Sequence, residues 1–304
     1  MNFYLFWLSI ENNHHHFIEG RFAGLNWPDH KKMAVVFSFD VDAESAFFFD
    51  QKNKRRMSLM SMGTYGRTVG LNRVLKLLKE FDLKANFFVP GIVAEIDPTV
   101  IERIVAEGHP IGHHGYLHER LDTLSAEQEE EVIVKGREII KKYAGYYPEG
   151  FRAPLWEMNR RTPSLLKKYR FKFDSSLMGN DVPYTIDCGN DEKILEIPVS
   201  WLLDDWEQFA YSAEPPIGFV IEDPNKVYNL WKAEFDGLYE EGGCLVLTMH
   251  PQLIGRSSRM NMLRKFIEYM FTKRGVWFTT MNEIERKWAE GEIKVEHFPF
   301  IEWN

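Results

Sequence analysis

Cysteine is scarce in this chain: its 304 residues include only two, Cys188 and Cys244. Their spacing fits neither a disulfide framework nor a cysteine-rich metal site. Two thiols in a chain of this length are typical of a reducing compartment. We therefore expect no disulfide bond and predict a cytoplasmic protein.

An excess of positive charge and long apolar runs are also missing. The net charge is −8, with 37 Lys and Arg against 45 Asp and Glu. Nucleic acid and anionic membranes attract a positive surface, so neither is an expected partner. The apolar stretch at residues 1–10 is too short to span a bilayer, and it lacks the basic region and cleavage site of a signal peptide. We expect residues 1–25 to form a surface arm or an oligomer contact, and we predict a homo-oligomer.

No internal repeat, low-complexity tract or Pro/Gly-rich linker divides the remaining chain. Apolar runs of strand length alternate with helical patterns, which favours a parallel sheet with helices outside it. Seven or eight such units can close into a barrel, and an open doubly wound sheet is the alternative. We predict a single catalytic domain over residues 26–304. The predicted strands are residues 33–39, 84–89, 109–112, 150–152, 171–173, 194–199, 244–249 and 276–279.

Two aspartates follow the first predicted strand. Asp40 and Asp42 lie two residues apart, so in extended backbone they project to the same side. Neighbouring carboxylates at the end of an apolar strand are costly unless a cation or hydrogen bonds receive them. The pair predicts a cation site, and a solvated acidic turn is the alternative.

Two histidines follow the third predicted strand. His114 and His118 are four residues apart, and on a helical turn both imidazoles would lie on one side and could bind one ion. The metalloprotease pattern His-Glu-x-x-His is excluded because Gly115 stands where it requires Glu. We expect the adjacent His113 to face the opposite way and to be a packing residue.

Two further polar residues lie at or directly after the ends of predicted strands. Arg152 could hold a carboxylate with a bidentate pair, although an ordinary surface arginine is the alternative. His250 follows the apolar strand 244–249 and is a candidate general acid or base; a buried histidine satisfied by its neighbours is the alternative. Two histidines and one carboxylate make a three-ligand metal site with positions open for water.

These motifs resemble the polysaccharide deacetylase family, the NodB-homology or carbohydrate esterase family 4 group. The resemblance spans about residues 26–290. The family pattern Thr-Phe-Asp-Asp-Gly corresponds to Ser38-Phe39-Asp40-Val41-Asp42, His-Ser/Thr-x-x-His to residues 114–118, Arg-x-Pro to residues 152–154 and Leu-x-x-His to residues 247–250.

Two departures from these patterns, Val41 and Gly115, are similar to one subgroup of the family. That subgroup contains the Helicobacter peptidoglycan deacetylase-like protein, cyclic imidases and allantoinase-like proteins. The family's fourth pattern, Asp-x-x-Asp-Trp, is not found. Asp174 is the nearest substitute and is therefore the candidate for orienting His250.

The resemblance implies a distorted (β/α) barrel of about seven parallel strands. It also implies a hydrolase of non-peptide carbon–nitrogen bonds, with Asp40 as general base held by Arg152 and His250 as general acid. A backbone N–H near Tyr116 is expected to stabilise the oxyanion. The expected cofactor is one divalent metal ion, with zinc as the predicted metal, on three side chains: Asp42, His114 and His118.

Aromatic residues gather in three long connections expected at the catalytic end, residues 43–66, 178–193 and 200–224. Such loops favour a covered pocket for a small molecule, with an oligomer interface as the alternative. The expected substrate contacts are Tyr116, Trp156 and Trp201.

We predict removal of an acetyl group from an N-acetyl amino sugar, or the opening of a small amide. The alternative within the same chemistry is hydrolysis of a cyclic imide or an allantoin-type ring. The alternative of another class is a catalytically silent carbohydrate-binding protein on the same fold.

Overall fold

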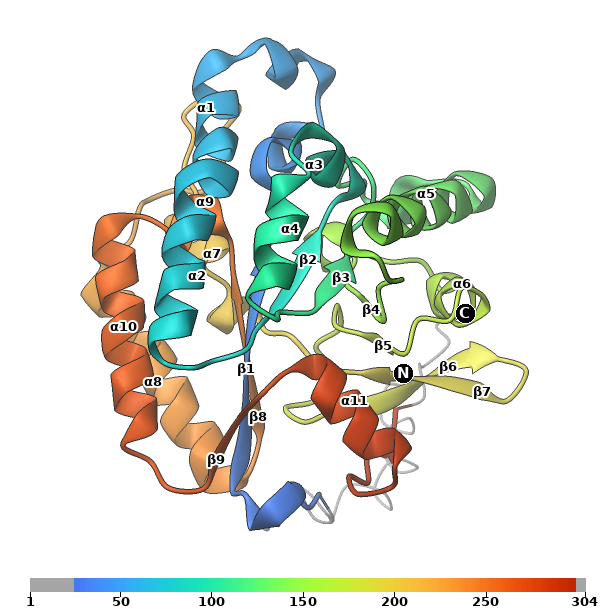
Figure 1. Ribbon diagram of the computed structural model, residues 1–304, viewed down its shortest axis with the longest axis vertical. Coiled ribbons are helices and arrows are strands. Elements are labelled where there is room, and N and C mark those ends of the chain that lie inside the picture. Colours follow the sequence, from blue (N-terminus) through green and yellow to red (C-terminus); the bar gives the residue numbers. More distant parts are fainter. Residues whose placement is uncertain (1–24, 299–304) are drawn as a thin grey trace, which may run out of the picture.

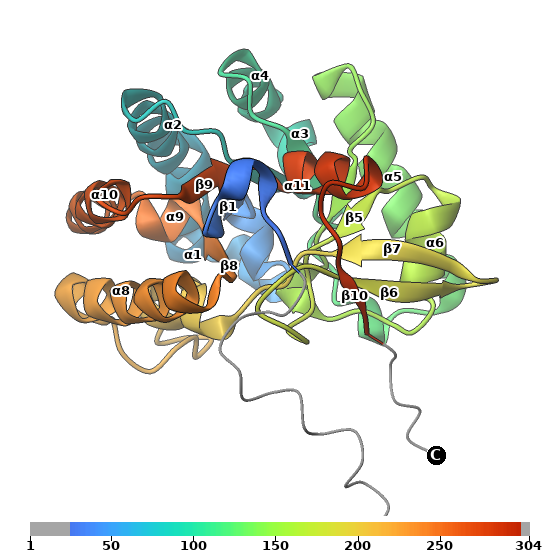
Figure 2. The same cartoon turned by 90° about the horizontal axis from the view of Figure 1, so that it is seen from below.

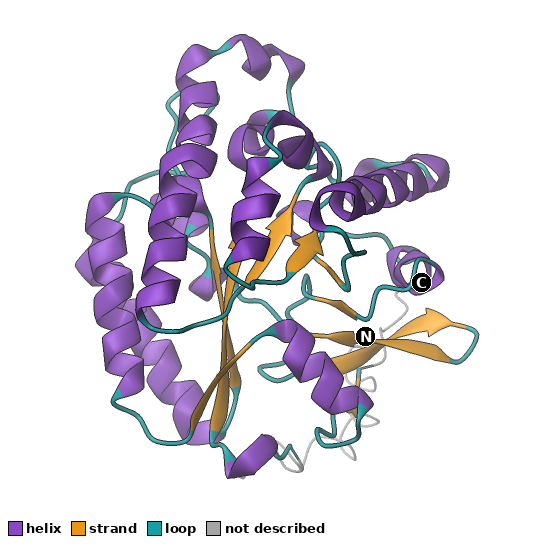
Figure 3. Cartoon of the chain, viewed as in Figure 1, coloured by secondary structure: helices purple, strands orange, loops and turns teal. Residues whose placement is uncertain are grey.

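The computed structural model describes residues 25–298, so the predicted N-terminal arm lies almost entirely outside the described residues. The described chain is an α/β fold, a distorted barrel with helices packed outside the strands (Figures 1 and 3). Its strands are β1 (Met33–Asp40), β2 (Asn86–Val89), β3 (Ile111–His113), β4 (Gly150–Phe151), β5 (Phe173–Asp174), β6 (Tyr184–Gly189), β7 (Glu192–Glu196), β8 (Cys244–Met249), β9 (Val276–Thr279) and β10 (Glu296–His297).

The strand order is β10-β6-β7-β5-β4-β3-β2-β1-β8, and β9 pairs with β1. All pairings from β5 to β8 are parallel, as are those of β7 with β5 and of β9 with β1. The predicted parallel barrel is thus confirmed. Because the strands run the same way, the residues that follow them collect at one end of the sheet.

The helices surround the strands when the molecule is seen from below (Figure 2). Within residues 25–298 no helix combines the length and apolar character needed to cross a membrane. The helices are α1 (Met57–Tyr65), α2 (Leu71–Glu80), α3 (Gly91–Ile96), α4 (Thr99–Ala106), α5 (Ala126–Ala144), α6 (Thr162–Lys168), α7 (Trp206–Phe209), α8 (Pro224–Glu241), α9 (Pro251–Ile254), α10 (Ser257–Phe271) and α11 (Met281–Ala289).

Side-chain alternation in β1 separates the core from the site. Every second residue, including Phe37 and Phe39, packs in the largest apolar cluster with the outer helices. The other row begins with Ala34 and Val36, which pack in a second cluster drawn from β1, β2, β5, β7 and β8. That inner row becomes polar towards the end of the strand, at Ser38, Asp40 and Asp42.

The same change from apolar to polar occurs along β8. Cys244 and Val246 belong to the inner cluster, whereas the next residues of that row are Thr248 and His250. Glycine keeps the neighbouring strands close: a Cβ on Gly112 of β3 would lie 2.4 Å from the Phe88 ring. The inside of the barrel is therefore apolar at one end and polar at the end that carries the predicted site.

The prediction for one of the three long connections is wrong. Residues 178–193 were expected to cover the catalytic end, but they contain β6, which pairs antiparallel with β7. The turn residues Asn190 and Asp191 have φ values of 53° and 61°, as two-residue hairpin turns require. The alternation of Tyr184, Ile186 and Cys188 was a strand signal that the length of the segment obscured.

The other two long connections do pack together. Phe47 and Leu59, from residues 43–66, share a small cluster with Trp206 and Ile217. Arg56 also forms an ion pair with Glu214, with 3.8 Å between Nη1 and Oε1. These two connections therefore hold each other in place beside the polar end of the barrel.

Candidate active site

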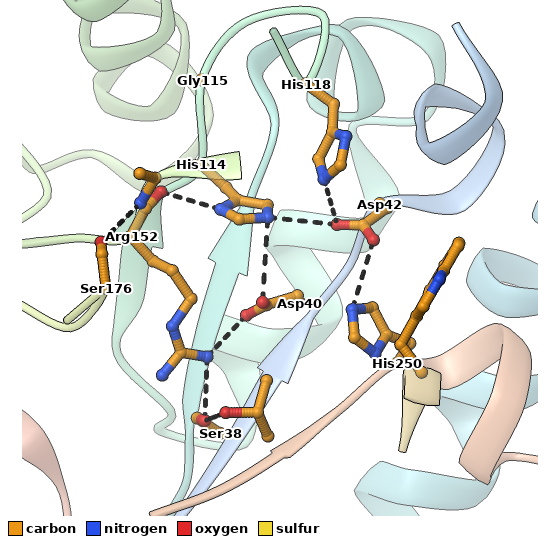
Figure 4. Close-up of polar contacts among 12 residues, drawn as sticks. Ser38, Asp40, Asp42, His114, Gly115, His118, Arg152, Ser176 and His250 are labelled. Atoms are coloured by element: carbon orange, nitrogen blue, oxygen red, sulfur yellow. Dashed lines mark hydrogen bonds and ion pairs between the residues drawn. The ribbon is translucent and has the colours of Figure 1, made fainter. Parts of the chain in front are cut away.

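The carboxylate of Asp42 lies between three imidazoles (Figure 4). Its Oδ1 atom is 3.4 Å from His114 Nε2 and 3.7 Å from His118 Nε2, and its Oδ2 atom is 3.5 Å from His250 Nε2. Asp42 and His114 are each 1% exposed. Three groups predicted from separate parts of the sequence are thus brought together.

The backbone that presents the two histidines differs from the expected helical turn. Residues 114–118 form a loop, with φ of 71° at Gly115 and 65° at His118. The helical explanation for the four-residue spacing is therefore wrong, although the rings do converge, with centroids 5.0 Å apart. The positive φ also explains glycine at position 115, because most other residues avoid that conformation.

Hydrogen bonds fix the protonation pattern of the histidines. His114 Nδ1 donates to the carbonyl oxygen of Arg152 at 2.8 Å, which leaves its Nε2 atom facing the two aspartates. The neighbouring His113 points away, as predicted: its Nε2 atom lies 3.1 Å from the Ile133 carbonyl oxygen, and its ring stacks on Phe151.

Burial and the facing charges act against each other in this cluster. Burial opposes ionisation of Asp42, but the three imidazoles hold the pKa of its carboxyl below its ordinary value. Burial likewise opposes protonation of His114, yet Asp40 and Asp42 raise its pKa. For His118 burial prevails and lowers the pKa to about 4, so this side chain is neutral at pH 7 with a free nitrogen lone pair.

Arg152 is completely buried, so the alternative of an ordinary surface arginine is excluded. Its Nη1 atom donates to Asp40 Oδ1 at 2.8 Å and to Ser38 Oγ at 3.0 Å. On the other side of the guanidinium, Nε donates to the Ser175 carbonyl oxygen and Nη2 to the Ser175 hydroxyl, both at 2.9 Å. Arg152, itself held by Ser38 and Ser175, thus orients the Asp40 carboxylate towards the His114 side of the cluster (Figure 4).

His250 is held by an aspartate that the sequence interpretation missed. Its Nδ1 atom donates to Asp205 Oδ1 at 2.7 Å, and the same oxygen accepts the backbone N–H of His250 at 2.9 Å. Asp204 Oδ1 lies 3.5 Å from the same Nδ1 atom. Burial opposes protonation of His250, but these carboxyls and Asp42 raise its pKa well above the ordinary value.

The prediction that Asp174 orients His250 is therefore wrong. Phe173 points into the barrel cluster, so the next residue, Asp174, points to the opposite face of the sheet. The signal for Asp205 was present in the sequence: Asp205-Trp206 retains the second half of the pattern Asp-x-x-Asp-Trp. Trp206 also contacts His250, with ring centroids 5.1 Å apart.

Replacing Asp205 by asparagine is expected to lower kcat by about 10- to 100-fold, because an outer partner fixes the ring orientation and tautomer of a catalytic histidine. Asp174→Asn is the matched control, since it also removes one buried carboxylate and is expected to leave kcat within about twofold. Initial rates of both variants at saturating substrate provide the measurement. Equal losses in the two variants would contradict the orienting role of Asp205.

The three residues expected to contact the substrate, Tyr116, Trp156 and Trp201, lie in different surroundings. Tyr116 is turned away from the aspartates: its hydroxyl donates to Glu95 at 2.9 Å and its ring lies under Lys135. Its backbone N–H already donates to Glu119 Oε2 at 3.0 Å, so it is not free to receive an oxyanion. Trp156 and Trp201 stack on each other, with ring centroids 4.1 Å apart.

Asp174 instead belongs to a buried pair of carboxyls with Glu196. Asp174 Oδ2 and Glu196 Oε2 are both buried without a hydrogen-bond donor. Burial raises the pKa of both carboxyls, and Asp174 raises that of Glu196 further, which favours a proton on one of them. Glu196 Oε1 also accepts the backbone N–H groups of Ser176 and Leu177, both at 2.9 Å. Ser176 Oγ donates to Asp174 and accepts the Ala153 N–H. The pair therefore supports the backbone next to Arg152.

Glu196→Gln is expected to raise the melting temperature at pH 8 by about 2–4 °C relative to the wild type, with a smaller difference at pH 4.5. Burial and Asp174 raise the pKa of Glu196 well above its ordinary value, so the folded chain keeps a proton that the unfolded chain releases. The free energy of unfolding of the wild type therefore falls as the pH rises above about 4.3. An amide supplies the same hydrogen bonds without that proton.

Thermal melts of the two proteins between pH 4.5 and pH 8 measure this difference. A difference in melting temperature that does not change with pH would contradict the shared proton.

The donors around Asp42 fit a metal ion. Ligand atoms of Asp42, His114 and His118 all lie within 4.8 Å of one another. Asp42 Oδ1 is buried and has no hydrogen-bond donor within reach, which is costly for a carboxylate unless a cation receives it. The carbonyl oxygen behind His114 also matches the usual outer partner of a metal-bound histidine.

Comparison with known proteins agrees with this arrangement. The family model described as Polysaccharide deacetylase matches residues 51–173. A peptidoglycan deacetylase from Helicobacter pylori is 33% identical over 279 residues, which cover 84% of this chain and 95% of that protein. The chain belongs to the polysaccharide deacetylase family. It is accordingly a hydrolase acting on carbon–nitrogen bonds other than peptide bonds.

Solved structures of relatives share the same architecture. The crystal structure of a Mycobacterium smegmatis protein named for this family is 40% identical, with a TM-score of 0.88, and the match covers 93% of this chain and 99% of that one. The crystal structure of Puue allantoinase is 27% identical with a TM-score of 0.77, covering 87% of this chain and 92% of that one. The fold of this polysaccharide deacetylase family member is therefore shared by proteins named for different substrates.

Proposed function

We propose that this chain is a metal-dependent deacetylase that removes the acetyl group of an N-acetyl amino sugar. The observation that carries the proposal is the buried Asp42 Oδ1 atom, which lies between His114 and His118 without a hydrogen-bond donor. Asp42, His114 and His118 would hold the ion, and zinc suits one carboxylate and two imidazoles. When bound, the ion would lower the pKa of a water molecule and polarise the acetyl carbonyl.

The flanking residues would carry the proton transfers. Asp40, oriented by Arg152, would accept a proton from the attacking water. The water oxygen would form the new bond to the acetyl carbon, and the bond from that carbon to nitrogen would break. His250 would donate a proton to the leaving nitrogen, since Asp204 and Asp205 favour its protonated form. The products would be acetate and the free amino sugar.

The likeness to Puue allantoinase supports a second candidate, the hydrolysis of a ureide or cyclic imide ring. The two candidates differ in their products, because ring opening releases no acetate. The deacetylase proposal is favoured by the Helicobacter pylori relative, which is named as a peptidoglycan deacetylase and which this chain matches over 95% of its length. A cytoplasmic location and a homo-oligomeric assembly remain predictions from the sequence.

The test is acetate release from N-acetylglucosamine oligomers by the purified full chain, together with its metal content. We expect about one ion per chain, as a three-ligand site requires, and activity that a chelator removes and added zinc restores. Allantoin and a cyclic imide serve as parallel substrates. Ring opening without acetate release would support the second candidate. A metal-free chain that acts on none of them would be the silent binding protein.

A further inference from the structure

Two tryptophans form a fixed stack beside the catalytic cluster. Trp156 ends the short helix η6 (Pro154–Trp156), and Trp201 begins η7 (Trp201–Leu203). Their rings are 4.1 Å apart at the centroids and inclined by 28°. Trp156 is only 5% exposed, whereas Trp201 is 43% exposed. The stack therefore has a buried base and an open outer ring.

The stack joins the two halves of the site. The helix η6 lies against the loop between the histidines, since a Cβ on Gly115 would be 3.0 Å from Pro154 Cγ. The helix η7 leads within a few residues to Asp205, which holds His250. Trp231 Nε1 donates to the Leu202 carbonyl oxygen at 3.1 Å and anchors η7 to α8. Through the stack, Trp201 thus connects the element beside the His114–His118 loop with the element that leads to Asp205.

The backbone beneath the stack is strained. Leu155 and Trp156 have φ values of 56° and 58°, in the left-handed region that residues other than glycine avoid. Backbone strain of this kind concentrates at ligand-binding and catalytic positions, where the surrounding structure maintains it. Here the strained turn places the Trp156 ring under Trp201.

The reacting side chains of the cluster are mostly covered. Asp40 is 2% exposed and His250 is 6% exposed. Trp206 packs on His250 and also on Phe47, with centroids 5.1 Å and 6.4 Å apart. Around the stack, Trp201 and its neighbours Leu155 and Leu202 offer exposed apolar surface, the two leucines being 48% and 47% exposed.

We propose that the exposed face of Trp201 is a stacking platform for the pyranose ring of the substrate. The acetamido group of the same sugar would reach the buried cluster around Asp42. The inference rests on the proposed function and names the part of the substrate that is recognised. One face of a pyranose carries mainly C–H groups, which match an aromatic surface, and its hydroxyls remain at the rim in water. The platform would select amides that carry a sugar ring over amides without one.

Trp201→Ala tests the platform through separate effects on KM and kcat. We expect KM for an N-acetylglucosamine dimer to rise about tenfold, with kcat within about twofold, because stacking serves binding rather than the reaction step. The rate constant kcat/KM for acetamide should not change. Trp201→Phe keeps an aromatic face, so its KM for the dimer should stay close to the wild-type value.

Trp277→Ala is the matched control. Trp277 also belongs to a tryptophan pair, with Trp27 at 5.9 Å, but β9 pairs with the first half of β1, away from the Asp40 end. This variant should keep the wild-type KM for every substrate.

An unchanged KM for the dimer in Trp201→Ala would overturn the platform and leave the deacetylase proposal standing. If the wild type shows no deacetylation, calorimetric titration with the N-acetylglucosamine dimer replaces the kinetic test. About tenfold weaker binding to Trp201→Ala than to the wild type would support the platform. Equal binding, or no binding to either protein, would overturn it.

Discussion

His114→Ala is expected to lower turnover by roughly 10³-fold or more and to reduce the bound metal well below one ion per chain. The substitution removes one of the three candidate ligands, Asp42, His114 and His118. The two ligands that remain, Asp42 and His118, are too few for a tight tetrahedral site. Metal content, acetate release and circular dichroism of the same preparation are the measurements.

His109→Ala is the control for this variant. His109 is also a buried histidine beside β3, where its Nδ1 atom accepts the Ala85 N–H at 3.3 Å, and burial lowers its pKa to about 4. Both variants leave a cavity and an unpaired backbone group, so both should lose some thermal stability. His109→Ala should keep its metal and its turnover. A folded His114→Ala variant with full metal content and activity would refute the metal site.

Sequence alone was sufficient for the parts of the site that follow strand periodicity. Asp40 and Asp42 lie on one row because a strand alternates its side chains, and the structure places both beside His114. Arg152 and His250 were predicted in the same way, from positions directly after apolar strands. A residue directly after a parallel strand lies at the same end of the barrel as the residues after the other strands, so its place in the sequence predicts its place in the site.

The remaining parts depended on backbone conformations and on distant packing. The loop from His114 to His118 uses left-handed residues, and its residue spacing is equally compatible with a helical turn. Asp205 reaches His250 from a long connection that no strand positions, so periodicity could not place it. Asp174 was chosen as the nearest substitute for the missing family pattern, but alternation turns it to the outer face, towards Glu196.

Asp40→Asn is expected to lower kcat by about 10²- to 10⁴-fold, the usual contribution of a general base, while KM changes only a few-fold. An asparagine oxygen can still accept the hydrogen bond from Arg152 Nη1, so the geometry of the cluster should be kept. The amide cannot take a proton from the attacking water. Steady-state kinetics and metal content of the same sample measure the two effects separately.

Asp42→Asn is the variant to compare with Asp40→Asn, because both aspartates lie on the inward-facing row at the end of β1. Asp42 Oδ1 lies closer to His114 Nε2 than does Asp40 Oδ2, at 3.4 Å against 3.8 Å, and only Asp42 also faces His118. We therefore expect Asp42→Asn to lose metal together with turnover, and Asp40→Asn to lose turnover with metal retained. Loss of metal in Asp40→Asn would make Asp40 a ligand and would require a different base, because a metal-bound carboxylate is no longer free to accept the proton.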